Sequence, residues 1–260
     1  MDLKLKGKTA LITGASKGIG FAVAEALAAE GCHLHLIART EADLASARER
    51  IAGRHGVKVE LHPMDLSERG RAKELAATCP EIDILVNSAG SIPRGTVEEI
   101  DEERWRAAWD LKVFGYINLT REYFRLMKSR RRGVIINIIG NGGERLDAAY
   151  IAGGAGNAAL MAFTRALGGS SAEVGVRVVG VNPGPVATER LIGLMRNAAQ
   201  SKFGDPERWK ELEKSFPLGR AATVEEIAAT VALLASDLSS YTTGTIVTID
   251  GGMANRGSLI

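Results

Sequence analysis

Short apolar runs alternate with helical patterns along the whole chain. Runs long enough for buried strands lie at 9–13, 33–38, 57–61, 83–87, 134–139, 176–182 and 245–249. The segments between these runs place apolar residues at helical spacing. This alternation predicts an α/β fold, in which helices cover both faces of a parallel, doubly wound sheet.

A glycine-rich stretch follows the first predicted strand. Residues 13–20 read TGASKGIG, and an alanine-rich helical segment follows at 21–29. Glycines here permit a tight turn and let the backbone approach a ligand closely. The N–H groups at the start of the helix suit a phosphate. The stretch therefore predicts a dinucleotide site, and the alternative is a purely structural turn.

Composition limits the classes of protein to consider. The 260 residues are 45% hydrophobic and carry a formal net charge of +2, which suits one domain over 1–260 and gives no general attraction to nucleic acid. The start of the chain is charged, and no apolar stretch approaches about 18 residues, so we expect neither a signal peptide nor a membrane span. Cys32 and Cys79 have no metal or redox spacing, which favours a reducing, cytoplasmic location.

Two histidines raise the question of a metal. His33 and His35 lie two residues apart on a predicted strand, so both side chains point to the same face. A two-histidine metal site is one interpretation. Because no third ligand is apparent, a strand face covered by a helix is favoured, and we predict no metal site.

The residues after the second strand bear on the choice of cofactor. Dinucleotide-binding folds commonly place an acidic residue there, which holds the ribose 2′-OH of NAD. This chain reads Ala38-Arg39-Thr40 instead, and Lys17 in the glycine turn adds a second cation. A guanidinium binds a 2′-phosphate well. NADP(H) is therefore favoured over NAD(H), and the alternative is two surface cations that never contact phosphate.

The GxxxGxG spacing of the turn and NSAG at 87–90 together resemble the short-chain dehydrogenase/reductase family. The resemblance runs from Lys8 to Met253 and implies a single Rossmann-type domain with sheet order 3-2-1-4-5-6-7. It implies ligands at the carboxyl ends of the strands. The cofactor-binding residues that it implies are Gly14, Ser16, Lys17, Gly18, Ile19, Gly20, Arg39, Asp65, Leu66, Asn87, Ala89, Gly90, Tyr150, Pro183, Gly184, Val186 and Thr188.

The family resemblance also implies roles for some of these residues. Asp65 would accept a hydrogen bond from the adenine amino group, although capping the helix that starts near Ser67 is an alternative. The segment 87–90 would pass close to the adenosine ribose. The backbone of Val186 and the hydroxyl of Thr188 would hold the carboxamide and the pyrophosphate.

The catalytic positions depart from the family pattern. The family uses a tyrosine, a lysine four residues later, a serine and an asparagine. Tyr150 matches the tyrosine, whereas Gly154 stands at the lysine position and Lys112 at the asparagine position. Ile139 and Gly140 stand where serines belong, so the standard mechanism should be badly impaired.

Three interpretations follow from this departure. In the first, the site is rewired: Tyr150 donates or accepts the proton, Lys112 projects into the space left by Gly154, and Asn141 donates to a substrate oxygen. Its alternative is that Lys112 points to solvent. In the second, the chain binds NADP(H) but is a non-redox enzyme or a sensor, and in the third it is a silent scaffold. We favour an oxidoreductase acting on an unidentified carbonyl or alcohol.

Two further segments acquire roles from the resemblance. Residues 189–217 mix apolar and charged residues and would form a lid over an apolar pocket, which favours an apolar small-molecule substrate. The segment 101–129 predicts a long, aromatic-rich helix. With the helix near Tyr150 it would build a homotetramer interface, a dimer being possible and simple core packing the alternative.

Overall fold

The computed structural model describes residues 1–256 and contains one seven-stranded sheet. All neighbouring strands are parallel, in the order β3-β2-β1-β4-β5-β6-β7, which confirms the predicted topology. The strands are β1 (Thr9–Thr13), β2 (His33–Ala38), β3 (Val59–Pro63), β4 (Ile84–Asn87), β5 (Gly133–Ile138), β6 (Val176–Pro183) and β7 (Ile246–Ile249). Each coincides with a predicted strand to within two residues at either end.

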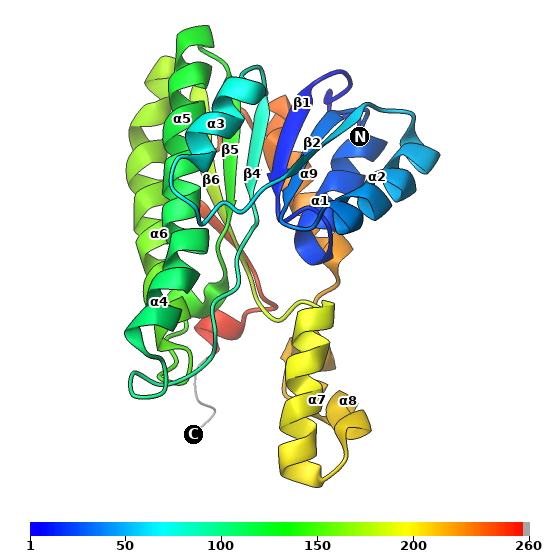
Figure 1. The fold of residues 1–260 in the computed structure, drawn as a ribbon, viewed down its shortest axis with the longest axis vertical. Helices are drawn as coiled ribbons and strands as arrows, with labels where there is room; N and C mark the ends of the chain where they lie inside the picture. Colours follow the sequence, from blue (N-terminus) through cyan, green and yellow to red (C-terminus); the bar gives the residue numbers. More distant parts are fainter. Residues whose placement is uncertain (257–260) are drawn as a thin grey trace.

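Helices cover both faces of the sheet (Figure 1). Alternate side chains on a strand point to opposite faces, so Ile12 packs with the helices on one face while its neighbour Leu11 packs with those on the other. One layer contains α1, α2 and α9, and the other contains α3, α5 and α6. The helices are α1 (Gly18–Ala29), α2 (Glu41–His55), α3 (Arg71–Thr78), α4 (Glu102–Trp109), α5 (Gly115–Arg130), α6 (Ile151–Ser171), α7 (Glu189–Phe203), α8 (Lys210–Glu213) and α9 (Val224–Ala235).

The long helix predicted over 101–129 is not a uniform α-helix. Helix α4 passes through a π-helical turn, η1 (Asp110–Phe114), before α5 continues to Arg130. Such turns widen a helix locally and are frequent at functional sites. Lys112 lies in the middle of this turn, so the irregular backbone sets the direction of its side chain.

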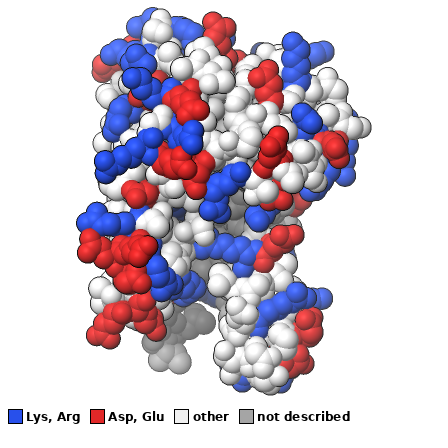
Figure 2. Space-filling model, in the orientation of Figure 1, with Lys and Arg blue, Asp and Glu red and all other residues white. Residues whose placement is uncertain are grey.

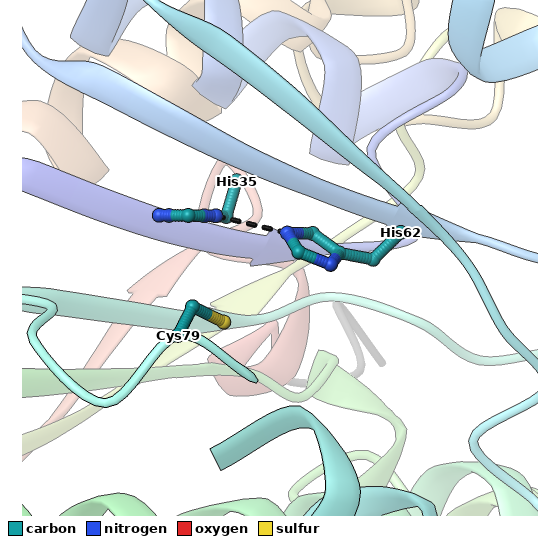
Figure 3. Close-up of side chains that lie close together, drawn as sticks. All are labelled: His35, His62 and Cys79. Atoms are coloured by element: carbon teal, nitrogen blue, oxygen red, sulfur yellow. Dashed lines mark hydrogen bonds between the residues drawn. The ribbon is translucent and has the colours of Figure 1, made fainter. Parts of the chain in front are cut away.

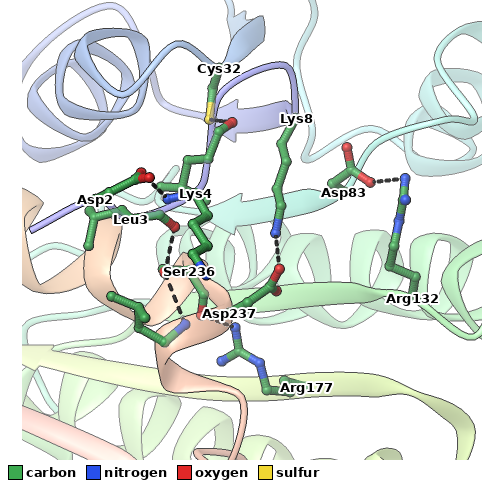
Figure 4. A network of polar contacts seen from close by, with 12 residues as sticks. Asp2, Leu3, Lys4, Lys8, Cys32, Asp83, Arg132, Arg177, Ser236 and Asp237 are labelled. Atoms are coloured by element: carbon green, nitrogen blue, oxygen red, sulfur yellow. Dashed lines mark hydrogen bonds and ion pairs between the residues drawn. The ribbon is translucent and has the colours of Figure 1, made fainter.

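Polar contacts fasten the amino-terminal segment to the turn that follows α9 (Figure 4). The Ser236 hydroxyl donates to the Leu3 carbonyl at 2.7 Å, and Lys8 Nζ pairs with Asp237 at 2.9 Å. Arg132 pairs with Asp83 at 2.6 Å beside them. These contacts lie near the amino ends of β1 and β5 and leave the carboxyl ends of the strands free for a ligand.

The segment 189–217 extends beyond the sheet as α7, α8 and short helical turns (Figure 1). Beyond it, Thr223 caps α9 and forms a reciprocal capping box with Glu226. Within residues 1–256, no helix combines the length and the apolar character that crossing a bilayer requires.

Candidate dinucleotide and catalytic site

A cavity of about 740 Å³ lies at the carboxyl ends of the strands. Its wall includes the end of β2 at Ala38, the end of β5 at Ile138 and the loop after β6 at Gly184. Figure 2 shows basic side chains around the hollow between the sheet and the α7–α8 segment. The cavity therefore occupies the place at which open α/β sheets bind ligands.

The glycine turn forms one end of the cavity. Gly14 has a φ of +65°, and a Cβ atom on Gly20 would lie 2.3 Å from the Gly14 carbonyl oxygen. No side chain fits between these two backbones. Helix α1 begins at Gly18, so its free N–H groups open towards the cavity, and the turn fits a pyrophosphate.

Most of the predicted cofactor residues line this cavity. Those that do are Gly14, Ser16, Lys17, Gly18, Ile19, Gly20, Arg39, Leu66, Ala89, Gly90, Pro183, Gly184 and Thr188. Thr188, after β6, lies against the glycine turn, because its methyl group is 3.4 Å from the position of a Cβ atom on Gly18. Four predicted residues, Asp65, Asn87, Tyr150 and Val186, are not part of the wall.

Asp65 and Asn87 support the cavity from behind. The Asp65 carboxylate accepts from both the backbone N–H and the hydroxyl of Ser67. It caps no helix there, because α3 begins at Arg71 with Gly70 as its N-cap residue. Burial acts to raise the pKa of Asp65, but the Ser67 hydrogen bonds and nearby Arg39 outweigh it and hold that pKa below its usual value. The Asn87 amide donates to Asn137 at 2.8 Å and thereby ties β4 to β5.

Lys112 lies at the other end of the cavity. Its side chain is half-buried, its stem lies against Gly90, and its Nζ donates to the Ile139 carbonyl. Burial, followed by the positive charge of Arg190, lowers the pKa of Lys112 to about 8. The structure thus places an amine that titrates near neutral pH on the cavity wall.

The position of Lys112 corrects one part of the rewired-site hypothesis. A Cβ atom on Gly154 would lie 3.3 Å from the Gly142 carbonyl oxygen and 3.9 Å from Leu146. Gly154 therefore faces the short helical turn η2 (Asn141–Gly143), whereas the Lys112 stem rests on Gly90. Lys112 faces the cavity as that hypothesis required, but it does not fill the space beside Gly154.

Tyr150 lies outside the cavity wall. It is the N-cap residue of α6, and its ring folds back over Gly153, where an added Cβ atom would lie 2.0 Å from Tyr150 Cζ. The ring packs with Ile92 and Ala152. Burial raises the pKa of Tyr150, and the nearby Arg190 and Arg94 offset part of that rise. Tyr150 is therefore a neutral phenol at neutral pH.

Asn141 is not part of the cavity wall either. Its side-chain Nδ2 donates to Asp250 Oδ2 at 3.2 Å. The carboxylate of Asp250 also accepts from the backbone N–H groups of Gly252, Met253 and Ala254. Asn141 therefore joins η2 to the segment after β7, and its predicted donation to a substrate oxygen stays a prediction.

Comparison with known proteins identifies the family. A family model described as enoyl-(acyl carrier protein) reductase matches residues 14–254. The 3-oxoacyl-[acyl-carrier-protein] reductase of Chlamydia muridarum is 31% identical over 98% of this chain and 100% of its own length. The chain belongs to the short-chain dehydrogenase/reductase family. It is thus an oxidoreductase of this type that uses a nicotinamide cofactor.

Solved short-chain dehydrogenase/reductase structures share the whole fold. The L-sorbose reductase of Gluconobacter frateurii, in complex with NADPH and L-sorbose, has a TM-score of 0.92 at 30% identity and covers 99% of this chain and 100% of its own. An NAD⁺-bound xylitol dehydrogenase has a TM-score of 0.86 at 25% identity, with coverage of 96% and 100%. These neighbours bind different nicotinamide cofactors and have different substrates in their names.

Two residues near the cavity were not predicted from the sequence. Arg190 lies in the first turn of α7 and on the cavity wall, and its guanidinium donates to the Ile92 carbonyl at 2.6 Å. Arg190 was not singled out in the sequence because the segment around it contains many other charged residues. Asn157 is buried one turn after Gly154, with Nδ2 3.1 Å from the position of a Cβ atom on Gly140. Only the folded structure shows that Asn157 faces the loop after β5, at Gly140 and Gly142.

Proposed function

We propose that this chain is an NADP(H)-dependent oxidoreductase that interconverts a carbonyl and an alcohol, with Lys112 transferring the proton. One observation carries the proposal: the half-buried amine of Lys112 lies on the wall of the dinucleotide cavity, and its pKa is lowered to about 8. A general acid works best when its pKa lies near the working pH. The raised pKa of Tyr150 makes that phenol a weaker proton donor.

The fit of the cavity to a dinucleotide rests on its backbone. The close approach of Gly14 to Gly20 leaves a turn that only glycine fills, and Ala89 lies against it, with Cα 3.0 Å from the position of a Cβ atom on Gly14. Arg39 and Lys17 on the same wall favour the 2′-phosphate of NADP(H). A bound nicotinamide would supply the hydride to the carbonyl carbon or accept it from the alcohol.

The position of Lys112 determines the proposed path of the proton. In the direction of reduction, the ammonium donates its proton to the substrate oxygen and becomes a neutral amine. The Ile139 carbonyl, which accepts from Nζ, holds the amine in place during this transfer. Lys112 then regains a proton from water. In the direction of oxidation the same amine accepts the proton from the alcohol.

The charges on the wall revise the predicted substrate. The apolar residues of 189–217 led us to expect an apolar substrate, but Arg190 and Lys112 bring two cations to one end of the cavity. Paired cations favour an anionic group. We therefore propose a carbonyl or alcohol that carries a carboxylate or a phosphate.

We also propose a homotetramer that packs through α5 and α6, as the family resemblance implied. These two helices lie next to each other on the outer side of the sheet (Figure 1). Light scattering of the purified chain would measure its mass, and a monomer would contradict this proposal. The cytoplasmic location stays a prediction.

The test begins with binding and then measures turnover. NADPH and NADH are titrated by nicotinamide fluorescence, and NADPH consumption is followed with 2-oxo acids, their methyl esters and simple ketones. We expect tighter binding of NADPH and faster turnover of the acids. Binding without turnover of any compound would favour a dinucleotide-binding protein without redox activity. Failure of both cofactors to bind at millimolar concentration would refute the proposal.

A further inference from the structure

A second group of reactive side chains lies apart from the dinucleotide cavity. His35 from β2, His62 from β3 and Cys79 after α3 place their ring nitrogens and sulfur within 4.8 Å of one another. Figure 3 shows the two imidazole rings joined by a hydrogen bond, with the Cys79 side chain beside them. His35 Nδ1 and His62 Nε2 are 2.9 Å apart. None of the three residues lines the dinucleotide cavity.

The sheet register creates this group. His35 pairs with Glu60 across the parallel β2–β3 ladder, and His62 lies two residues after Glu60. Paired residues, and residues two apart on a strand, share one face of a sheet. All three side chains therefore point to the face covered by α3. Cys79 is the C-cap residue of that helix, which brings its buried thiol to the same place.

The donor atoms suit a thiophilic divalent cation. Two imidazoles and a thiolate are the ligands that Zn²⁺ and Co²⁺ accept in tetrahedral sites. With Zn–N near 2.0–2.1 Å and Zn–S near 2.3 Å, tetrahedral donors lie roughly 3.3–3.8 Å apart. The observed separations therefore need shifts of about 1 Å or less. An exposed oxygen of Glu60, 3.6 Å from His35 Nδ1, is available as a fourth ligand.

The surroundings also suit a metal-bound sulfur. Tyr123 Oη lies 3.2 Å from Cys79 Sγ, so its hydroxyl can donate to a thiolate. Outer hydrogen bonds of this kind orient a ligand. His35 and His62 are only half-buried at the β3 edge of the sheet, which gives an ion a route from solvent.

We propose that His35, His62 and Cys79, completed by Glu60, form a binding site for Zn²⁺ or a similar divalent cation. Bound metal would fasten β3 and the end of α3 to the sheet. Because none of the three residues is part of the cavity wall, we assign the metal a structural role. The alternative is a hydrogen-bonded histidine pair beside a thiol that donates to the Leu75 carbonyl at 3.2 Å.

Cobalt provides a direct test. Full-length protein without an affinity tag is treated with EDTA, dialysed and titrated with Co²⁺, whose thiolate complexes absorb strongly in the near ultraviolet. We expect one equivalent of Co²⁺ to produce this absorption and the visible bands of a tetrahedral site, and Zn²⁺ to abolish both. An excess of Zn²⁺ one hundred times above its Kd should raise Tm by roughly 5 °C.

Variants identify the ligands. Cys79→Ser should abolish the thiolate band and weaken Zn²⁺ binding at least about 100-fold, and His62→Gln should weaken it about tenfold or more. Cys32→Ala is the matched control, because Cys32 is the other buried cysteine and its thiol donates elsewhere, to the Leu5 carbonyl. NADPH binding checks that each variant is folded. Absence of the band in wild type, or its survival in Cys79→Ser, would overturn the proposal.

Discussion

The two ends of the dinucleotide cavity differ in whether backbone or side chains determine their properties. At the glycine turn, backbone shape sets the fit: a Cβ atom on Gly20 would lie 2.3 Å from the Gly14 carbonyl oxygen. At the other end, side chains set the chemistry. There Lys112 projects from a π-helical turn towards Ile139, while the ring of Tyr150 covers Gly153 outside the cavity wall.

With Lys112 as the proposed proton donor, this difference explains how a binding site can persist while its chemistry changes. The backbone of the turn suits any dinucleotide, and a single added Cβ would disturb it. A proton donor needs only a titratable group in reach of the substrate, and a different helix can present one. The predictions below separate the two ends, beginning with the largest expected effect.

Replacing Lys112 should affect the chemistry most. We expect Lys112→Met to lower kcat roughly 10²–10³-fold, the general scale for loss of one charge-stabilising donor, and to change the Kd of NADPH little. Lys128→Met, at an exposed lysine of α5, is the matched control. In wild type, the rate of reduction should fall as pH rises through about 8, where Lys112 loses its proton. A wild-type pH profile that persists in Lys112→Met would contradict the assignment.

The same variant should be more stable than wild type. The unfolded chain binds a proton at Lys112 up to about pH 10.5, whereas the folded chain releases it at about pH 8. Wild-type stability therefore rises between these pH values, and the penalty is complete below pH 8. Lys112→Met should raise the free energy of unfolding at pH 7 by about 1–3 kcal/mol. Urea unfolding at pH 7 and pH 10 would measure this gain, which should shrink at the higher pH.

Adding one methyl group should damage the glycine end selectively. Gly20→Ala forces the turn apart, and a cost of about 1–3 kcal/mol corresponds to an NADPH complex weaker by about 5- to 150-fold. Gly53→Ala is the control, since nothing lies within 4 Å of its Cβ position in α2. That control should gain about 1 kcal/mol in stability and keep its affinity. Equal NADPH affinity in wild type and Gly20→Ala would show that the turn does not hold the cofactor.

Reversing one charge should change which cofactor is preferred. Arg39→Asp removes an exposed guanidinium from the cavity wall and adds a carboxylate that repels a 2′-phosphate. Loss of a charged hydrogen bond costs about 1.5–3 kcal/mol, so NADPH should bind at least tenfold more weakly while NADH binds as well or better. Isothermal titration calorimetry with both cofactors would measure this. Unchanged NADPH affinity would remove Arg39 from the cofactor site.

The smallest effect is expected at Tyr150. Because its ring packs on Gly153 away from the cavity wall, Tyr150→Phe should change kcat less than about threefold, well under the range for a true general acid. The pH profile should keep its fall near pH 8. A loss of 100-fold would restore Tyr150 as the proton donor that its sequence position suggested, and would move Lys112 to a supporting role.

Local patterns were enough to predict the strands and the α/β class, whereas the sheet order came from the family resemblance. The apolar runs predicted the strands because a strand covered by helices on both faces needs apolar residues along its whole length. The GxxxGxG turn between β1 and α1 was predictable because its glycines meet a local steric requirement. Thr223 and Glu226 form a capping box that is equally local, because both partners lie within one turn of the helix. The Asp65 contact is also local, because its carboxylate accepts from the backbone N–H of Ser67, two residues away.

The chemistry depended on tertiary structure. Tyr150, Lys112 and Asn141 were identified by position in a motif, yet the direction of each side chain depends on distant neighbours. The space above Gly153 holds the Tyr150 ring, the π-helical turn aims Lys112 at Gly90, and Asp250 holds Asn141.

The proposed metal site shows the same division. The sequence determined that His33 and His35 share a strand face, and from that pair it predicted no metal site. Only the register of β2 with β3 brought His62 to His35, and only the packing of α3 added Cys79. Contacts between residues 17 to 44 positions apart depend on how elements pack, and periodicity along the chain does not encode them.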